Sequence, residues 1–117
     1  MADHSAVEKY KALCAGVGDV SWKAMFGGYC LYCDGMVFAL VDDGKLFIKV
    51  DAENVGAFDE AGSLPFTYPQ KDGTLQEMKY RLCPDVSSAE AVAPWAELGV
   101  EAARRAAARK KPKKPKK

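Results

Sequence analysis

The spacing of apolar residues predicts a helix near the start of the chain. Across residues 6–15 they recur every three or four positions, as in a helix with one buried face: Val7, Tyr10, Leu13 and Cys14. The preceding Ser5-Ala6-Val7-Glu8 has the form of a capping box, with Ser5 as the N-cap and Glu8 at the third helical position. We therefore expect an amphipathic helix over residues 6–15.

Between Val20 and Asp51 the pattern changes to short apolar runs separated by two turn signals, Asp34-Gly35 and Asp43-Gly44. These signals predict an antiparallel meander of three strands. Two-residue turns would set the cross-strand pairs: Cys33 with Met36, Tyr29 with Leu40, Val41 with Leu46, and Val37 with Val50.

This register divides the strand residues between two faces of the sheet. One face would carry Cys30, Tyr32, Val37, Ala39, Val41, Leu46, Ile48 and Val50. The other would carry Tyr29, Leu31, Cys33, Met36, Phe38, Leu40, Phe47 and Lys49. Both faces are largely apolar, whereas an antiparallel sheet commonly has one polar face. Either helices cover both faces, or helices cover one and a second subunit covers part of the other. We favour the second arrangement.

The later elements are shorter or interrupted. Asp51 can cap a helix over residues 52–61 with Phe58 turned inward, and residues 66–68 and 77–82 look like a strand pair. A last helical region then opens at Ser88, and Pro94 favours a restart with that proline at the first helical position. One stripe of this helix would hold Trp95, Leu98, Ala102 and Ala106.

Two further features of this last region bear on packing. Three small residues would permit close helix packing: Gly99, Ala103 and Ala106. Arg105 follows Glu101 by four residues, which predicts a modest ion pair along the helix.

Composition places these elements in one small α+β domain. The chain has 117 residues with 49% hydrophobic content, enough for a single core. We expect an antiparallel β-sheet flanked by helices over residues 1–108, and a disordered Lys/Pro tail over residues 109–117. No secretory signal or membrane-spanning stretch is visible, so we expect a cytoplasmic protein with reduced cysteines.

The charge is divided unevenly between the domain and the tail. The chain has a net charge of +1, but the last nine residues carry seven basic side chains: Arg109, Lys110, Lys111, Lys113, Lys114, Lys116 and Lys117. Residues 1–108 then have ten Lys and Arg against sixteen Asp and Glu. An acidic domain repels nucleic acid, so the tail is the candidate nucleic-acid-binding segment, making phosphate contacts that do not depend on base sequence. A merely solubilising tail is the alternative.

Residue types that carry catalysis or bind metals are sparse. Cys30-x-x-Cys33 lies within an expected strand, where a separation of three residues sends the two sulfurs to opposite faces. His4 is the single histidine, Asp42-Asp43 occupies a turn, and Gly27-Gly28 lacks the Lys and Ser/Thr of a phosphate loop. We therefore expect no enzyme activity, no cofactor and no metal.

Several segments resemble the N-terminal domain of the TfoX/Sxy family. The segments that carry the likeness are Trp22-Lys23-Ala24-Met25-Phe26-Gly27-Gly28-Tyr29, Leu46-Phe47-Ile48-Lys49-Val50-Asp51, Pro65-Phe66-Thr67-Tyr68, Met78-x-Tyr80-Arg81-Leu82 and Pro94-Trp95. Cys30 stands where the family commonly has Gly, and Lys23 where Arg is usual. The likeness covers roughly residues 5–108, so the chain is similar to the single-domain members.

The resemblance implies an α+β fold related to the secretion chaperones and a link to competence genes, working with the cyclic-AMP receptor protein. It implies no catalytic residues. The Met-Phe-Gly-Gly segment indicates a strand end followed by glycines where backbone bends or passes closely.

Three functions remain open after this reasoning. The first is a transcriptional accessory protein that contacts a regulator or polymerase, with the tail touching DNA. The second is a homodimeric, chaperone-like interaction module without a nucleic-acid role. The third, which we favour least, is an enzyme or ligand-binding protein with an apolar pocket near Tyr29, Tyr68 and Tyr80.

Overall fold

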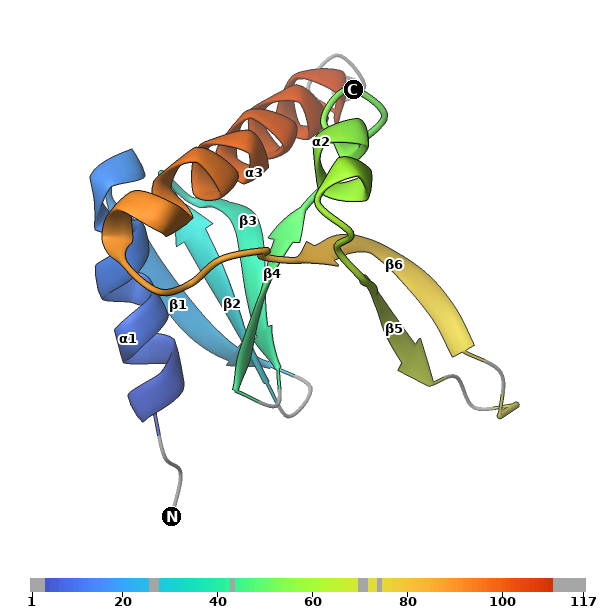
Figure 1. Cartoon of the computed structure of the whole chain (residues 1–117), viewed down its shortest axis with the longest axis horizontal. Coiled ribbons are helices and arrows are strands. Elements are labelled where there is room, and N and C mark those ends of the chain that lie inside the picture. The colour runs from blue at the N-terminus through green and yellow to red at the C-terminus, as the bar shows by residue number, and fades with distance from the viewer. Residues whose placement is uncertain (1–3, 26–27, 43, 70–71, 74, 111–117) are drawn as a thin grey trace, which may run out of the picture.

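A computed structural model describes residues 4–25, 28–42, 44–69, 72–73 and 75–110. Figure 1 shows a layer of helices packed on a six-stranded antiparallel sheet, which confirms the expected α+β class. In chain order the elements are α1 (Ser5–Cys14), the 3-10 turn η1 (Ala15–Val17), β1 (Val20–Met25), β2 (Gly28–Cys33), β3 (Met36–Asp42), β4 (Lys45–Lys49), α2 (Val55–Glu60), β5 (Pro65–Pro69), β6 (Leu75–Leu82) and α3 (Ala89–Lys110).

The strands lie in the order β1-β2-β3-β4-β6-β5, and each neighbouring pair is antiparallel. The expected meander and the strand pair after it are therefore confirmed. The sequence did not predict β1, which joins the free edge of β2. Figure 1 shows β5 and β6 extending away from the helices.

The register is confirmed near the turns and wrong farther from them. Cys33 pairs with Met36 and Val41 with Leu46, as predicted. Tyr29, however, pairs with Val41 rather than Leu40, because a bulge between Leu31 and Tyr32 shifts the β2–β3 register by one residue. The expected pair of Val37 with Val50 does not form, because β4 ends at Lys49 and the Val50 N–H donates to Lys79 O.

The bulge corrects the predicted faces of the sheet. Beyond the bulge, a register shift of one residue places the side chains of one strand on the opposite face relative to those of the partner strand. Leu31 thus shares a face with Ala39 and Ile48, whereas Cys30 shares the opposite face with Leu40 and Phe47.

The helices α1, α2 and α3 lie on one face of the sheet, where the main core is found (Figure 1). This core joins inward residues of the helices to one face of the strands, namely Val7, Tyr10, Cys14, Phe58, Val92, Ala96, Val100 and Ala103 with Val20, Leu31, Cys33, Phe38, Ala39, Val41, Leu46, Ile48, Val50 and Cys83. The alternative in which helices cover both faces is therefore wrong for the described residues.

The helix starts differ in part from the prediction. α1 begins at Ser5 itself, so His4 is its N-cap, and Glu8 accepts a hydrogen bond from Trp22 Nε1 at 2.8 Å instead of closing a capping box. Ser88 does open α3, since its Oγ accepts a hydrogen bond from the Ala91 N–H at 3.1 Å.

α3 runs without a break through Pro94, so the expected restart is wrong. Val92 and Ala96, one on each side of the proline, are both fully buried and hold the two segments against the same core. The buried stripe is also rotated from the predicted one, toward Gly99 and Ala103. At Gly99 a Cβ would lie 2.7 Å from Ile48 Cγ2 and 2.8 Å from Phe38 O, so a small residue is required there, although against the sheet rather than a helix.

Candidate binding surface

The face of the sheet turned away from the helices is apolar and edged by lysines. The cross-strand register places Cys30, Leu40, Phe47 and Leu82 in one row across four strands. We call this side the open face and define it by Lys23, Cys30, Tyr32, Val37, Leu40, Phe47, Lys49, Tyr80 and Leu82. Most of these side chains are half-buried, Cys30 is buried, and none belongs to the main core cluster.

Two lysines of the open face lie over tyrosine rings. Lys23 Nζ is 5.7 Å from the centroid of the Tyr32 ring, and Lys49 Nζ is 5.4 Å from that of Tyr80. Burial raises the pKa of the Tyr80 hydroxyl to about 12, with smaller contributions from Cys30 and Tyr32. The open face therefore joins aromatic surface with positive charge.

A shallow hollow of about 170 Å³ lies where β5 approaches β4, next to the open face. Its lining comes from both strands and the end of β3: Asp42, Lys45, Phe47, Pro65, Phe66 and Thr67. The Phe47 and Phe66 rings meet there with centroids 4.8 Å apart. Sequence analysis missed this site. The available signal was the alternation of Lys45, Phe47 and Lys49, which places all three on one side of β4.

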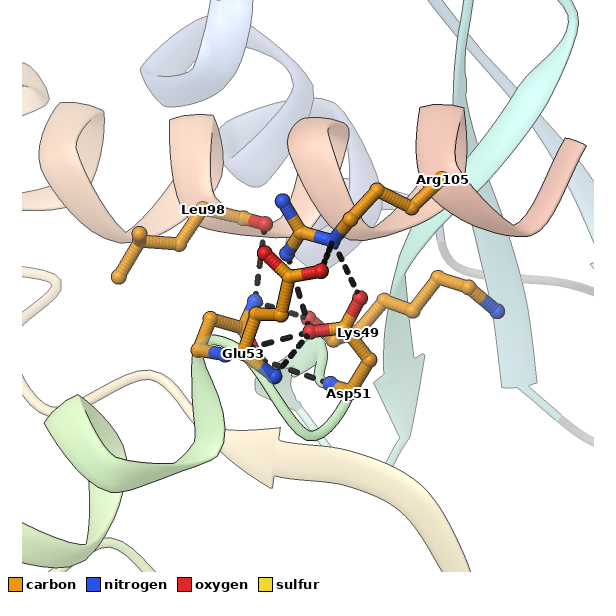
Figure 2. Close-up of polar contacts among 6 residues, drawn as sticks. Lys49, Asp51, Glu53, Leu98 and Arg105 are labelled. Carbon is orange, nitrogen blue, oxygen red and sulfur yellow. Dashed lines mark hydrogen bonds and ion pairs between the residues drawn. The ribbon is translucent and has the colours of Figure 1, made fainter. Parts of the chain in front are cut away.

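A buried polar cluster fastens α3 to the segment after β4 (Figure 2). Asn54, which is only 4% exposed, donates from Nδ2 to Leu98 O at 2.9 Å and to Lys49 O at 3.3 Å. Its Oδ1 accepts from the Asp51 N–H at 2.8 Å. These bonds join three segments of the chain through one side chain.

Asp51 forms the charged half of this cluster. Its two oxygens accept from Arg105 Nε at 2.7 Å and Nη2 at 2.9 Å, and one of them also accepts from the Glu53 N–H at 3.0 Å (Figure 2). The Arg105 hydrogen bonds hold the pKa of the Asp51 carboxyl below its usual value, and the same contact raises the pKa of Arg105. Asp51, which was predicted to cap a helix, thus accepts backbone hydrogen bonds in a turn just before α2.

This cluster also replaces the expected pair of Glu101 with Arg105, because the guanidinium turns toward Asp51 and Glu53 instead. No buried side-chain nitrogen or oxygen in the described part of the chain lacks a hydrogen-bond partner. We therefore interpret the cluster as structural.

The four cysteines are all buried, and none of them is in a disulfide. Cys30 lies on the open face, and Cys33 lies on the helical side, where its Sγ donates to Val17 O at 3.8 Å. The two sulfurs therefore point apart, as the strand pattern predicted. Burial raises the pKa of all four thiols, to about 12 for Cys14 and about 11 for Cys83. These environments keep the thiols protonated and disfavour nucleophilic chemistry.

His4 belongs to an aromatic cluster on the helical side. Its Nδ1 lies 3.1 Å from the Tyr29 hydroxyl, and its ring is 4.8 Å from the Trp22 ring. Tyr29 therefore lies on the face opposite Tyr80, so these two residues do not line one pocket. The Tyr68 side chain lies outside the described part of the structure.

Two other predicted features are only partly described. Asp42 lines the hollow, whereas Asp43 and Gly27 lie outside the described residues. At Gly28 a Cβ would be 2.5 Å from Val41 O, which confirms that backbone passes closely there. Among the residues that the structure describes, no three His, Cys, Asp or Glu side chains form a group suited to a metal ion.

The basic tail lies largely beyond the described part of the chain. Arg109 and Lys110 end the backbone of α3, and nothing is described of their side chains. The other candidate nucleic-acid-binding residues, Lys111, Lys113, Lys114, Lys116 and Lys117, lie outside the described residues. The assignment of the tail to nucleic acid therefore stays a prediction.

Comparison with protein families identifies the domain. The model of the TfoX N-terminal domain matches residues 12–103, which is most of the chain and runs from α1 to the middle of α3. The chain belongs to the TfoX N-terminal domain family. A search of curated proteins found no match. In the described part of this TfoX-family chain, no helix has both the length and the apolar character to cross a membrane.

Proposed function

We propose that this TfoX-family protein is a non-enzymatic regulatory protein that acts by binding another protein through its open face. The observation that carries the proposal is the one-sided packing of the domain. Helices bury one face of the sheet, and the opposite face retains half-buried apolar side chains such as Leu40, Phe47 and Leu82. Contiguous apolar surface edged by polar residues is characteristic of protein interaction sites.

The chemistry of the domain supports binding rather than catalysis. The most polar site, around Asp51 and Arg105, is internally satisfied, and the thiols are shielded. His4 lies beside Tyr29 and Trp22, without a nucleophile near it among its described contacts. The family resemblance makes transcription components the first partners to test, with the cyclic-AMP receptor protein and RNA polymerase ahead of others.

In this proposal the basic tail has a separate role, which is to contact DNA. Its seven cations would contact phosphates without reading bases, and would hold the complex near DNA while the acidic domain faces protein. The body and the tail would thus bind different partners.

Co-purification from cell lysate tests both parts. We expect the full chain to retain a transcription component, and a chain ending at Ala108 to retain it also while losing low-salt DNA binding. Circular dichroism of the shortened chain checks that α3 is intact. Failure of the full chain to retain either a transcription component or DNA would contradict the proposal.

The competing function is a homodimeric interaction module in which a second copy covers the open face. The same apolar surface favours it. Sedimentation at micromolar concentration decides between the two, because the dimer requires a doubled mass that our proposal does not.

A further inference from the structure

The two edges of the sheet differ in how they are protected from pairing with another strand. β5 forms one edge and carries Pro65 and Pro69, which have no backbone N–H to donate. β1 forms the other edge and contains no proline. Within the described part of the chain, no other strand pairs with the outer side of β1. An edge of this kind is a template for an added strand.

The hydrogen bonds between β1 and β2 show which residues face outward at this edge. The Asp34 N–H donates to Asp19 O at 3.2 Å, so these two residues form a hydrogen-bonded pair one position before β1 begins. Hydrogen-bonded and non-hydrogen-bonded pairs alternate along antiparallel strands. The residues whose backbone N–H and C=O groups point away from β2 are therefore Val20, Trp22 and Ala24.

The side chains along this edge carry both signs of charge on the side of the open face. Asp19 and Lys23 are exposed, and their spacing of four residues places them on the same side of the strand, with Ser21 between them. Lys23 Nζ lies over the Tyr32 ring at 5.7 Å, a surface contact from which the long side chain can turn to a neighbouring strand. The order acid, hydroxyl, base is complementary to itself when a second strand runs in the opposite direction.

We propose that a second copy of the chain pairs its β1 with this edge, antiparallel and about a two-fold axis at Ser21, which joins the two sheets into one. Asp19 of each chain then lies opposite Lys23 of the other, and Val20 lies opposite Trp22. The outward-facing pairs exchange about four backbone hydrogen bonds in all. Both open faces remain uncovered, so this dimer differs from one formed across the open face and does not depend on the proposed function.

The charges favour a second copy over an unrelated strand. A charged edge opposes pairing in general, because an added strand takes its charges partly out of water. A strand with the opposite order of charges pairs with both Asp19 and Lys23, and β1 with its preceding residue has that order. A two-fold axis at Trp22 would instead place Lys23 opposite Ser21 and leave the charges unpaired.

The pairing should be weak, because it joins two short strands and two exposed ion pairs. We expect a dissociation constant of about 10⁻⁴ M, as for small transient interfaces. The free chain should therefore sediment as a monomer at micromolar concentration and associate near about 100 μM. Covalent trapping is suited to detecting such a dimer.

Disulfide trapping of Ser21→Cys in the full chain tests the pairing. All four native cysteines are buried, so the added thiol is the exposed one. The Cα atoms at the axis would lie about 4.5 Å apart, within the range of a disulfide. We expect a covalent dimer on a non-reducing gel after mild oxidation. The matched control is Ala24→Cys, which is also exposed on β1 but would lie about 20 Å from its counterpart and should cross-link at least tenfold more slowly.

Charge reversals in the Ser21→Cys chain test the register. Asp19→Lys or Lys23→Asp alone replaces two attractions with two repulsions and should slow cross-linking about tenfold. The two reversals together restore opposite charges at both pairs and should restore the rate, which a damaged fold would not do. Glu60→Lys makes the same charge change on an exposed residue of α2 and should have no effect.

Three outcomes overturn the pairing. One is equal cross-linking by Ser21→Cys and Ala24→Cys, and another is no recovery when both charges are reversed. The third is a Ser21→Cys chain that stays monomeric while Asp19→Lys loses a transcription component that the wild type retains, which assigns the edge to that component. If Ser21→Cys stays monomeric and Asp19→Lys still retains the component, the pairing is wrong and the proposed function stands.

Discussion

Single side chains hold α3 against the rest of the domain, and Asp51 is the clearest case. Its carboxylate receives two hydrogen bonds from Arg105 and lies at 14% exposure. Asp51→Asn should lower the free energy of unfolding by about 1–3 kcal/mol at neutral pH, because it replaces charge-assisted hydrogen bonds with neutral ones. Urea unfolding followed by circular dichroism measures the change.

The effect should depend on pH in a defined direction. The folded-state pKa of Asp51 is lowered, so its contribution is complete above the unfolded value of about 4 and is lost as the pH falls through the lower folded value. The difference between wild type and Asp51→Asn should therefore shrink below about pH 4. Asp34→Asn is the control, because Asp34 approaches Arg104 only at 4.0 Å on the surface. Equal losses at both positions would contradict the assignment.

Gly99 gives a second test at this scale. Gly99→Ala should destabilise the protein by about 1–3 kcal/mol, because the added methyl meets Ile48 and the Phe38 carbonyl. Gly56→Ala, in α2 with nothing within 4 Å, should instead stabilise it by about 0.5–1 kcal/mol. Thermal unfolding compares the two substitutions, and a neutral Gly99→Ala would show that α3 is not held closely against the sheet.

At the scale of elements, the sequence predicted most helices and strands but missed part of the register between β2 and β3. Turn signals such as Asp34-Gly35 act locally, so the pairs next to them were predictable. The bulge between Leu31 and Tyr32 was not predictable, because it depends on packing between strands and does not change the alternation of residues. The shift of one residue moved Cys30 and Leu31 to the faces opposite to those predicted, and therefore changed the composition of the open face.

In α3, packing against the core overrides the low helix propensity of Pro94. It lies exposed inside α3, where it removes a backbone hydrogen bond that the continuous helix otherwise makes. Pro94→Ala should raise the free energy of unfolding by about 1 kcal/mol or more. Chemical unfolding gives the value. A loss of stability would show that the proline is needed for the approach of Val92 to the core.

For the whole molecule, the division of charge was readable from composition, whereas the hollow between β4 and β5 was not. The hollow requires β5 to lie near β4 across β6, a long-range arrangement that no local pattern specifies. The tail needs no such arrangement to attract phosphates, because its seven cations act through charge alone.

DNA binding by the whole chain should accordingly be dominated by the tail. The logarithm of the binding constant should fall with the logarithm of salt concentration, by about 0.9 for each phosphate contacted. Anisotropy with mixed-sequence duplexes should show this slope for the full chain, no preference among sequences, and binding near zero for a chain ending at Ala108. An unchanged slope after truncation would show that the tail does not contribute to nucleic-acid binding.

Nuclear magnetic resonance of the ¹⁵N-labelled full chain is the most direct test of the open face as the protein-binding surface. A transcription component retained in the co-purification is titrated into it. We predict shift changes concentrated on the open face, at residues such as Tyr32, Leu40 and Phe47, with α1 and the outer side of α3 unaffected. Changes confined to the helices, with the open face undisturbed, would contradict it.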